Sequence, residues 1–388
     1  MKWPWHDFRP LLPLQKELKK VTTPLLPHEQ AAVEKIRQQT RERNGDNVDR
    51  TRAYLDYYLR RSEIHWALLA HLVSRNAGWN MTDLRGELLP RLLSAKEQTD
   101  YFSFLERGNW LIFHDVYPQL LLYEESVKRQ TNLFHLLPHL QVSAFMQGVW
   151  NHFWKTGDRE LLAIGLIINE QNYLEAQVMR DPGYQNTVVR TLPFTLQELM
   201  QLNQILFPYE EESRDGSFGQ EIRDRRTSPI QVIGQIVSHF ASLPERIALG
   251  KSLYALLFGT SAYFDGVLAW TKRQVHTGSR KDFWPHLFHD VNESVPGKPY
   301  QKKVVNCQIK QGANRLYSPT LTYAWKPVIH ERPSAEDWYR GQEDVLGQLT
   351  YAKMPDASVE MGETYCKTVE KMELAVVARG KIFGTRAF

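Results

Sequence analysis

Cysteine is scarce in this sequence. Cys307 and Cys366 are the two cysteines among 388 residues, and they make neither a metal-ligand spacing nor a disulfide framework, which is typical of proteins from a reducing compartment. The opening residues, MKWPWHDFRPLLPLQKELKK, lack the unbroken apolar core of a secretory signal, because His6, Asp7, Arg9 and several prolines interrupt it. Both observations predict a cytoplasmic protein.

Long apolar runs and an excess of one charge are also lacking. The most apolar stretches, 161–168 and 253–270, are too short or carry polar residues such as Ser261 and Asp265, so no membrane span is predicted. Basic residues number 48 against 44 acidic ones, and they are scattered, which gives no sign of a nucleic-acid-binding surface. The chain has no phosphate-binding glycine loop and no nucleophile elbow, so no motif names an activity.

Apolar and aromatic residues, in contrast, are plentiful. The sequence is 42% hydrophobic and 12% aromatic, with 11 Trp, which predicts a folded, soluble protein with a core rich in large rings. The alternative is an aromatic surface for a protein partner. Two segments could dock on a partner or wrap the body: an N-terminal arm with Trp3, Trp5 and Phe8, and a tail with Tyr317, Tyr323, Trp325, Trp338 and Tyr339.

Helical periodicity predicts a mainly α fold, a large multi-helix body with an irregular, partly extended C-terminal segment. The three predicted parts are residues 1–48, an N-terminal arm and a first helix; residues 49–294, the helical body with an exposed loop at about 209–228; and residues 295–388, extended or irregular with a short helix. The predicted boundaries include a helix that opens at Pro27, a helix over 98–106 that Gly108 interrupts, a helix capped by Asp158, and helices at about 196–206 and 229–242.

One predicted helix is apolar over most of its circumference and is therefore expected at the centre of the body. Ser62 is a good N-cap for it, and Asn76 and Gly78 are stop signals. The run EIHWALLAHLVSRNAGWNMTDL, which contains this helix, resembles the YppC-like proteins, an uncharacterised family of mainly Bacillus-type proteins. The resemblance covers roughly residues 45 to 290 and implies no activity.

Polar residues on this helix predict an interior polar cluster. Glu170 lies within the apolar stretch LLAIGLIINEQNYL, where an ionised carboxylate needs a partner. We expect Arg75 to pair with it, and Glu170→Ala would then leave a buried cation at a cost of about 3–5 kcal/mol. The predicted cluster comprises Glu63, His71, Arg75, Asn76 and Glu170, while Asn80 and Asp83 follow on the same stretch.

A metal site is the alternative use of these residues. Helical carboxylate sites place Glu and His inward at turn spacing, and metal phosphohydrolases use a His-Asp doublet with an earlier His. The candidate ligands are His71, His114, Asp115 and Glu170, with Asp158 or Asp181 as a later carboxylate and His289-Asp290 as a second doublet. No Glu-x-x-His occurs in either helix, and a dipeptide is a weak motif.

The sequence therefore favours a binding or scaffold protein with an interior polar cluster. The alternative is a metal-dependent hydrolase or oxidase with its site inside the helical body, and a divalent metal is the one cofactor that the residue pattern would suit.

Overall fold

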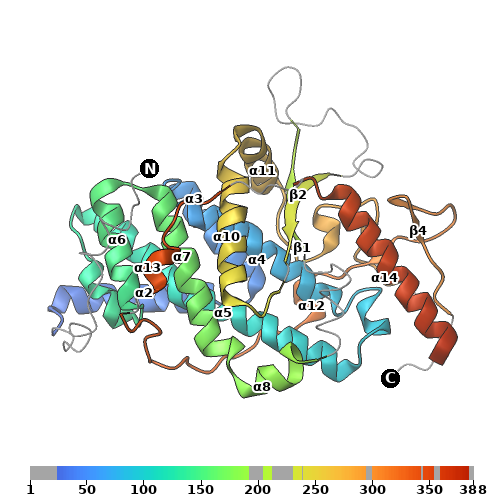
Figure 1. Ribbon diagram of the computed structural model, residues 1–388, viewed down its shortest axis with the longest axis horizontal. Helices are drawn as coiled ribbons and strands as arrows, with labels where there is room; N and C mark the ends of the chain where they lie inside the picture. The colour runs from blue at the N-terminus through green and yellow to red at the C-terminus, as the bar shows by residue number, and fades with distance from the viewer. Residues whose placement is uncertain are drawn as a thin grey trace.

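The computed structural model describes residues 24–191, 204–211, 230–237, 239–293, 299–341, 344–353 and 359–383. Over these residues the fold is mainly α, as predicted (Figure 1). The longer helices are α2 (Pro27–Arg43), α3 (Asn47–Arg60), α4 (His65–Asp83), α5 (Ala95–Arg129), α6 (Ala144–Thr156), α7 (Arg159–Leu174), α10 (Leu243–Phe258), α11 (Ser261–Arg273) and α14 (Gly362–Phe383).

Short helical segments and strands complete the described chain. The short helices and turns are η1 (Leu89–Arg91), η2 (Phe134–Leu140), η3 (Glu175–Met179), α8 (Pro182–Tyr184), η4 (Gln185–Val189), η5 (Arg280–Asp282), α12 (Leu321–Ala324) and α13 (Asp344–Gln348). The strands are β1 (Gln204–Tyr209), β2 (Gln231–Ile236), β3 (Phe288–His289), β4 (Val304–Val305), β5 (Gln308–Ile309) and β6 (Leu316–Tyr317).

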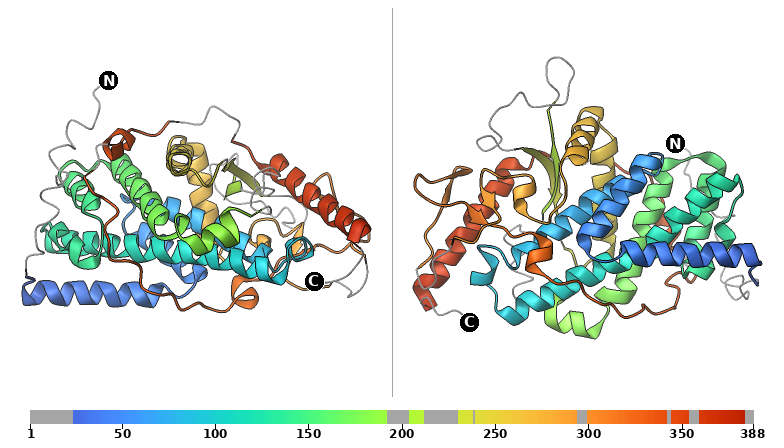
Figure 2. Two further views of the ribbon diagram at one scale, coloured as in Figure 1. Left: turned by 60° about the horizontal axis from the view of Figure 1, so that its bottom comes forward. Right: turned by 180° about the vertical axis from the view of Figure 1, so that it is seen from behind.

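The helices form an elongated body in which α4 is central. Figures 1 and 2 show α2 and α6 toward one end, α14 at the other end, and α4 and the long α5 between them. The main hydrophobic core draws buried side chains from α2 through α11 and also from Tyr339, Val345 and Leu349 of the C-terminal segment. No helix in the described parts of the chain combines the length and the apolar character needed to cross a membrane.

The central helix α4 was predicted with the wrong ends. It begins at His65 after Ile64, not at Ser62, and it continues past Asn76 and Gly78 to Asp83. Asn76 does not end the helix, because its side-chain amide donates to the carbonyls of Leu72 (2.9 Å) and Leu206 (2.8 Å). Gly78 has a packing role, since an added Cβ would lie 2.4 Å from Asn47 Oδ1 and 2.5 Å from His276 Nε2.

Helix α5 was predicted as separate pieces but is one helix of 35 residues. Its start follows from local sequence, because the Ser94 hydroxyl accepts from Glu97 N while the Glu97 carboxylate accepts from Ser94 N. Gly108 and Pro118 both lie inside the helix. Apolar residues of α5 are buried along the helix before Gly108 and after it, on both sides of Pro118. The packing of these residues outweighs the low helix propensity of Gly108 and Pro118.

Two segments predicted as helices contain strand residues. β1 and β2 pair antiparallel, with Leu206 opposite Gly234, so the helix predicted over 229–242 is wrong and the one around 196–206 cannot include its last residues. Gly234 permits this pairing, because a Cβ there would lie 1.9 Å from the Ile205 carbonyl oxygen. Residues 192–203 and most of the predicted loop at 209–228 lie outside the described residues, as does the N-terminal aromatic arm.

Other predicted boundaries are confirmed. Pro27 is the first residue of α2, and the Asp158 carboxylate accepts from Leu161 N at the start of α7 (3.0 Å).

The C-terminal region is irregular, as predicted, but it ends in the unpredicted 22-residue helix α14. Glu373 of α14 accepts from the backbone N–H groups of Lys303 (2.7 Å) and Val304 (3.0 Å), beside the β4–β5 hairpin. A disulfide joins Cys307 to Cys366, so the expectation that the two cysteines make no disulfide framework is wrong. The tail rings largely wrap the body: Trp325 stacks on Phe102, although Tyr323 is 79% exposed.

Candidate functional site: an interior cavity

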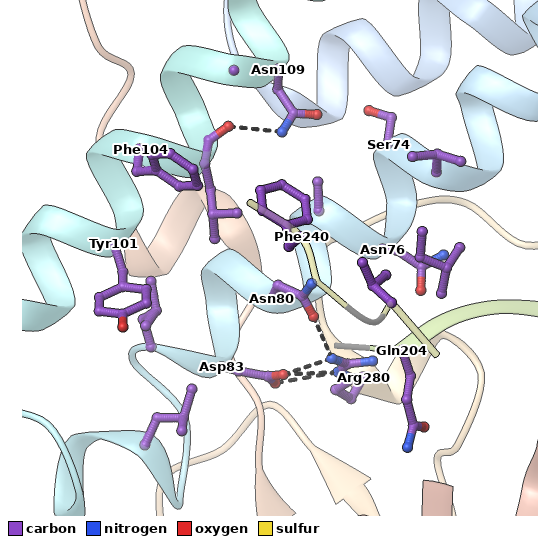
Figure 3. Close-up of a pocket in the computed structure, with 18 of the residues that line it drawn as sticks. Ser74, Asn76, Asn80, Asp83, Tyr101, Phe104, Asn109, Gln204, Phe240 and Arg280 are labelled. Carbon is purple, nitrogen blue, oxygen red and sulfur yellow. Dashed lines mark hydrogen bonds and ion pairs between the residues drawn. The ribbon is translucent and has the colours of Figure 1, made fainter. Parts of the chain in front are cut away.

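A cavity of about 600 Å³ lies among α4, α5, α7, α10, α14 and β1. Most of its wall is apolar, and Figure 3 shows part of it, with Tyr101 and Phe104 of α5 facing Asn76 and Asn80 of α4. Thr191 is hydrogen-bonded to Tyr101 of the wall (3.3 Å), and Gln204 lines the cavity. A cavity of this volume and polarity is typical of small-molecule sites.

One face of α4 forms a wall of the cavity. Most residues of α4 in the lining follow the helical repeat of three or four positions: Trp66, Leu69, Ala70, Val73, Ser74, Ala77, Asn80, Asp83. Asn76 lies beside them and also lines the cavity. The opposite side of α4 is covered by α3, where His71 Nδ1 donates to the Thr51 carbonyl (2.7 Å). Because α3 fixes one face of α4, the other face is presented to the cavity.

Arg280 forms the most polar part of the wall. Its guanidinium donates to Asp83 Oδ2 (2.7 Å) and to Asn80 Oδ1 (2.9 Å), as Figure 3 shows. Burial alone would lower the pKa of Arg280, but the nearby Asp83 carboxylate raises it above the usual value. Arg280 is therefore charged, and its charge is neutralised within the wall.

Glu170 of α7 is the second polar group of interest. Its Oε2 accepts from the Trp66 indole N–H (3.2 Å) and its Oε1 accepts from the Gln171 side chain (3.2 Å). Burial is the main reason that the pKa of Glu170 is raised to about 8, and the nearby Asp115 raises it further. Glu170 is therefore mostly protonated at neutral pH, since no cationic group of the described chain is hydrogen-bonded to it or paired with it.

The other acidic side chains in the lining have cationic partners. Asp83 pairs with Arg280 (2.7 Å), and Glu87 pairs with Lys303 (3.2 Å). On the basic side, Arg246 pairs with Glu175 of η3 (2.7 Å). Within the described lining, Glu170 is thus the carboxyl group that lacks an ion-pair partner.

The predicted polar cluster is divided among separate places. Arg75 donates to His71 Nε2 (2.8 Å) and to the Gln274 carbonyl, and it lies over the Trp270 ring. Glu63 instead accepts from the Tyr123 hydroxyl (3.1 Å). Asn76 binds the backbone of Leu206 in β1 and also lines the cavity.

The predicted pair between Glu170 and Arg75 is therefore wrong. Glu170 bonds Trp66 and Gln171, whereas Arg75 is directed toward α11 and the residue after it. Burial lowers the pKa of Arg75 to about 10 and brings the pKa of His71 well below its usual value. Glu170→Ala would leave no buried cation behind, so the expected cost of about 3–5 kcal/mol loses its reason.

The metal candidates point in different directions. His114 stacks on Trp110, while the adjacent Asp115 accepts from Gln119 (3.0 Å) and Asn169 (2.5 Å). Burial raises the pKa of Asp115 to about 7, which disfavours the ionised form that binds metals. Among the described residues no group of three or more His, Cys, Asp or Glu side chains is placed to hold a metal ion.

Sequence reasoning missed Arg280 and Arg246 as parts of the site. Asn80 and Asp83 were noted on the central stretch, and one helical turn separates them, which is a usable signal. Arg280 lies about two hundred residues away, in a short basic cluster with no period. Arg280 contacts α4 because η5 packs against that helix. Local sequence does not encode a contact between such distant segments.

The fold and the site together define a mainly helical protein with a large apolar interior cavity that holds a few polar groups. Comparison with known proteins gives its family. The chain belongs to the family described as "Protein of unknown function (DUF2515)", whose model matches residues 42–366. The match extends beyond the stretch of about 45 to 290 that the resemblance covered.

A curated protein is also similar to the chain over most of its length. The chain is 37% identical to "Uncharacterized protein YppC" of Bacillus subtilis (strain 168) over 319 residues, which are 81% of this chain and 86% of the relative. No solved structure matches the chain significantly.

Proposed function

We propose that this protein binds a hydrophobic small molecule in the interior cavity. The observation that carries the proposal is a mostly apolar space of about 600 Å³ inside the helical body, which is within the usual range for ligand sites. The cavity favours a binding role over a scaffold role, because a scaffold would need an outer surface and not an interior space.

A neutral fluorescent probe tests this proposal. N-phenyl-1-naphthylamine is apolar and becomes bright when it leaves water, so the full-length protein should enhance its fluorescence saturably, with about one probe per chain. If no saturable binding is seen, the space is filled by the chain itself and the proposal fails.

A pair of glycine variants places the probe in the cavity. Gly108 lines the cavity, and a Cβ there would meet only Leu174 Cδ2, at 3.7 Å. Gly108→Leu should therefore fill part of the space and weaken probe binding by about tenfold or more. Gly380→Leu is the matched control, because Gly380 is an exposed residue of α14 with open space around it. Equal binding by both variants would show that the probe sits elsewhere.

The metal-dependent hydrolase or oxidase is the rival proposal, and elemental analysis separates the two. Stoichiometric iron, manganese or zinc in the purified protein, with stability that falls on adding a chelator, would favour the enzyme. A metal-free protein that still binds the probe would leave the binding role ahead.

We also propose the cytoplasm as the location, from the sequence arguments alone. The Cys307–Cys366 disulfide stands against a reducing compartment. Alkylation of thiols in intact cells, followed by mass spectrometry, should find the two cysteines reduced if the protein is cytoplasmic, and linked if it is not.

A further inference from the structure

We infer that the cavity selects a hydrophobic organic cation, whose ammonium group lies against the Glu170 carboxylate. This inference rests on the proposed binding function and names the chemical class of its ligand. Two features carry it: the missing ion-pair partner of Glu170 within an apolar wall, and the neutralised charges elsewhere in the lining.

The carboxyl group of Glu170 is built into the wall without a counter-charge. It accepts hydrogen bonds from Trp66 and Gln171, both neutral donors, and the charged group acting on it is Asp115 of α5, which has the same sign. A carboxylate in an apolar space is costly unless a cation accompanies it. A cationic ligand would supply that missing charge.

Aromatic rings flank the same position. Trp66, which binds Glu170, and Tyr54 both line the cavity, and their ring centroids are 5.4 Å apart in an edge-to-face arrangement. Tyr54 is close enough for a charge on Glu170 to raise its pKa. Tyr54 and Trp66 are only 3% and 1% exposed, and Trp66 meets Glu170 with its N–H edge, so they close the wall behind the carboxyl group and keep its surroundings apolar.

The basic side chains of the lining already have partners, so they do not provide an unpaired charge for an anionic ligand. Arg280 is held by Asp83, and Arg246 by Glu175. Arg379 donates to the Arg91 carbonyl (3.2 Å), so its guanidinium already has a hydrogen-bond partner. An anionic ligand would have to compete with existing partners, whereas a cation meets an unpaired carboxyl group.

Binding of a cation beside Glu170 should release a proton from its carboxyl group, and this release can be measured. Glu170 holds a proton at neutral pH because burial raises its pKa to about 8, and a bound cation favours the ionised form. Binding should therefore release close to one proton per ligand at pH 6.5, and the affinity for a cation of fixed charge should rise as the pH increases toward 8. The titratable groups near Glu170 are Asp115 of α5 and Tyr54 of α3. The nearest cation in its hydrogen-bond network is Arg246 of α10, which donates to the Gln171 side chain (3.0 Å) and not to Glu170 itself.

The test compares amphiphiles of one chain length in the full-length protein. Dodecyltrimethylammonium, dodecanol and dodecyl sulfate, each below its micelle concentration, compete with N-phenyl-1-naphthylamine. We expect the cation to bind about tenfold or more tighter than dodecanol. Calorimetry in two buffers with different ionisation enthalpies should report the proton release.

Two variants assign the selectivity to Glu170. Glu170→Gln keeps the side-chain shape but cannot ionise, so the cation should lose its advantage over dodecanol and the proton release should vanish, while the neutral probe still binds. Asp115→Asn is the matched control, because Asp115 is buried beside Glu170 but does not line the cavity. This variant should keep the preference for the cation.

Each outcome separates the inference from the proposed function. Equal affinities for the cation and dodecanol, tighter binding of dodecyl sulfate, or an unchanged preference in Glu170→Gln would overturn the cation inference while leaving the cavity as a ligand site. Failure of every amphiphile and of the neutral probe to bind would instead overturn the proposed function.

Discussion

Arg50 of α3 and Glu106 of α5 form a buried ion pair. Arg50 is 1% exposed, and its guanidinium donates to Glu106 Oε2 at 2.5 Å and to Asn44 Oδ1 at 3.2 Å. Burial alone would raise the pKa of Glu106, but Arg50 and His330 outweigh this effect and hold it below its usual value. This pair ties α3 to α5 and, through His330, to the C-terminal segment.

Removing one member of this pair should destabilise the protein strongly. We expect Glu106→Ala to lower the free energy of unfolding by about 3–5 kcal/mol, because it leaves the Arg50 charge buried without a partner. Urea denaturation measures the change. Glu363→Ala breaks an exposed pair with Lys367 and should change stability by about 0.5 kcal/mol or less; similar effects of the two substitutions would contradict the buried role.

Glu170 should make stability depend on pH. Its pKa is about 8 in the folded protein against 4.5 as the ordinary value, so its full contribution is present below about pH 4.5 and is lost as the pH rises through 8. Between these limits the free energy of unfolding should fall by up to about 1.4 kcal/mol per pH unit from this group. Glu170→Gln should remove that part of the slope.

Urea denaturation of both proteins between pH 5 and pH 9 measures this effect. Asp115, whose pKa is raised to about 7, acts in the same direction in both proteins, so the difference between the two curves isolates Glu170. Parallel curves for the wild type and Glu170→Gln would show that Glu170 is not held in its protonated form.

At the scale of elements, α5 shows how packing overrides local propensity. Gly108 in its interior is destabilising relative to Ala, because glycine loses more backbone freedom on folding. A Cβ at this position would meet Leu174 Cδ2 at an ordinary contact distance of 3.7 Å. The wall of the cavity therefore has room for a larger residue.

Gly108→Ala should accordingly stabilise the protein by about 0.5–1 kcal/mol. Gly165→Ala on α7 is the matched comparison, since its Cβ would lie 2.6 Å from Val149 Cγ1, and overpacking of that kind costs about 1–3 kcal/mol. Thermal denaturation of both variants checks the opposite signs, and a loss of stability in Gly108→Ala would indicate that the cavity wall is closed there.

Helix α14 was missed although its sequence carried a signal. Tyr365, Val369 and Val376 are buried at helical spacing, which is the pattern that identified other helices. The proline- and glycine-containing stretch before it suggested extended chain throughout the tail. The glutamates of α14 that hold the β4–β5 hairpin gave no comparable signal, because their partners are backbone groups distant in sequence.

At the scale of the whole molecule, the disulfide between Cys307 and Cys366 attaches α14 to the hairpin across 59 residues. Closing a loop of that size restricts the unfolded chain, so in the oxidised protein we expect it to contribute about 3–4 kcal/mol. A reductant should lower the urea midpoint of the wild type. In the double variant Cys307→Ser, Cys366→Ser, a reductant should leave the urea midpoint unchanged. An unchanged midpoint in the wild type would contradict the structural role of the disulfide.

The sequence by itself determined the mainly α class, the irregular tail and several helix starts, because these depend on local periodicity and capping. It also determined the family, because a family is recognised from residue similarity along the chain. Tertiary structure decided the rest. Whether Asn76 stops a helix or holds β1, whether Gly108 breaks α5, and whether Glu170 meets Arg75 or Trp66 depend on which elements pack together, and that choice follows from burial summed over distant residues. The cavity has the same origin, since its wall combines side chains of helices far apart in the chain.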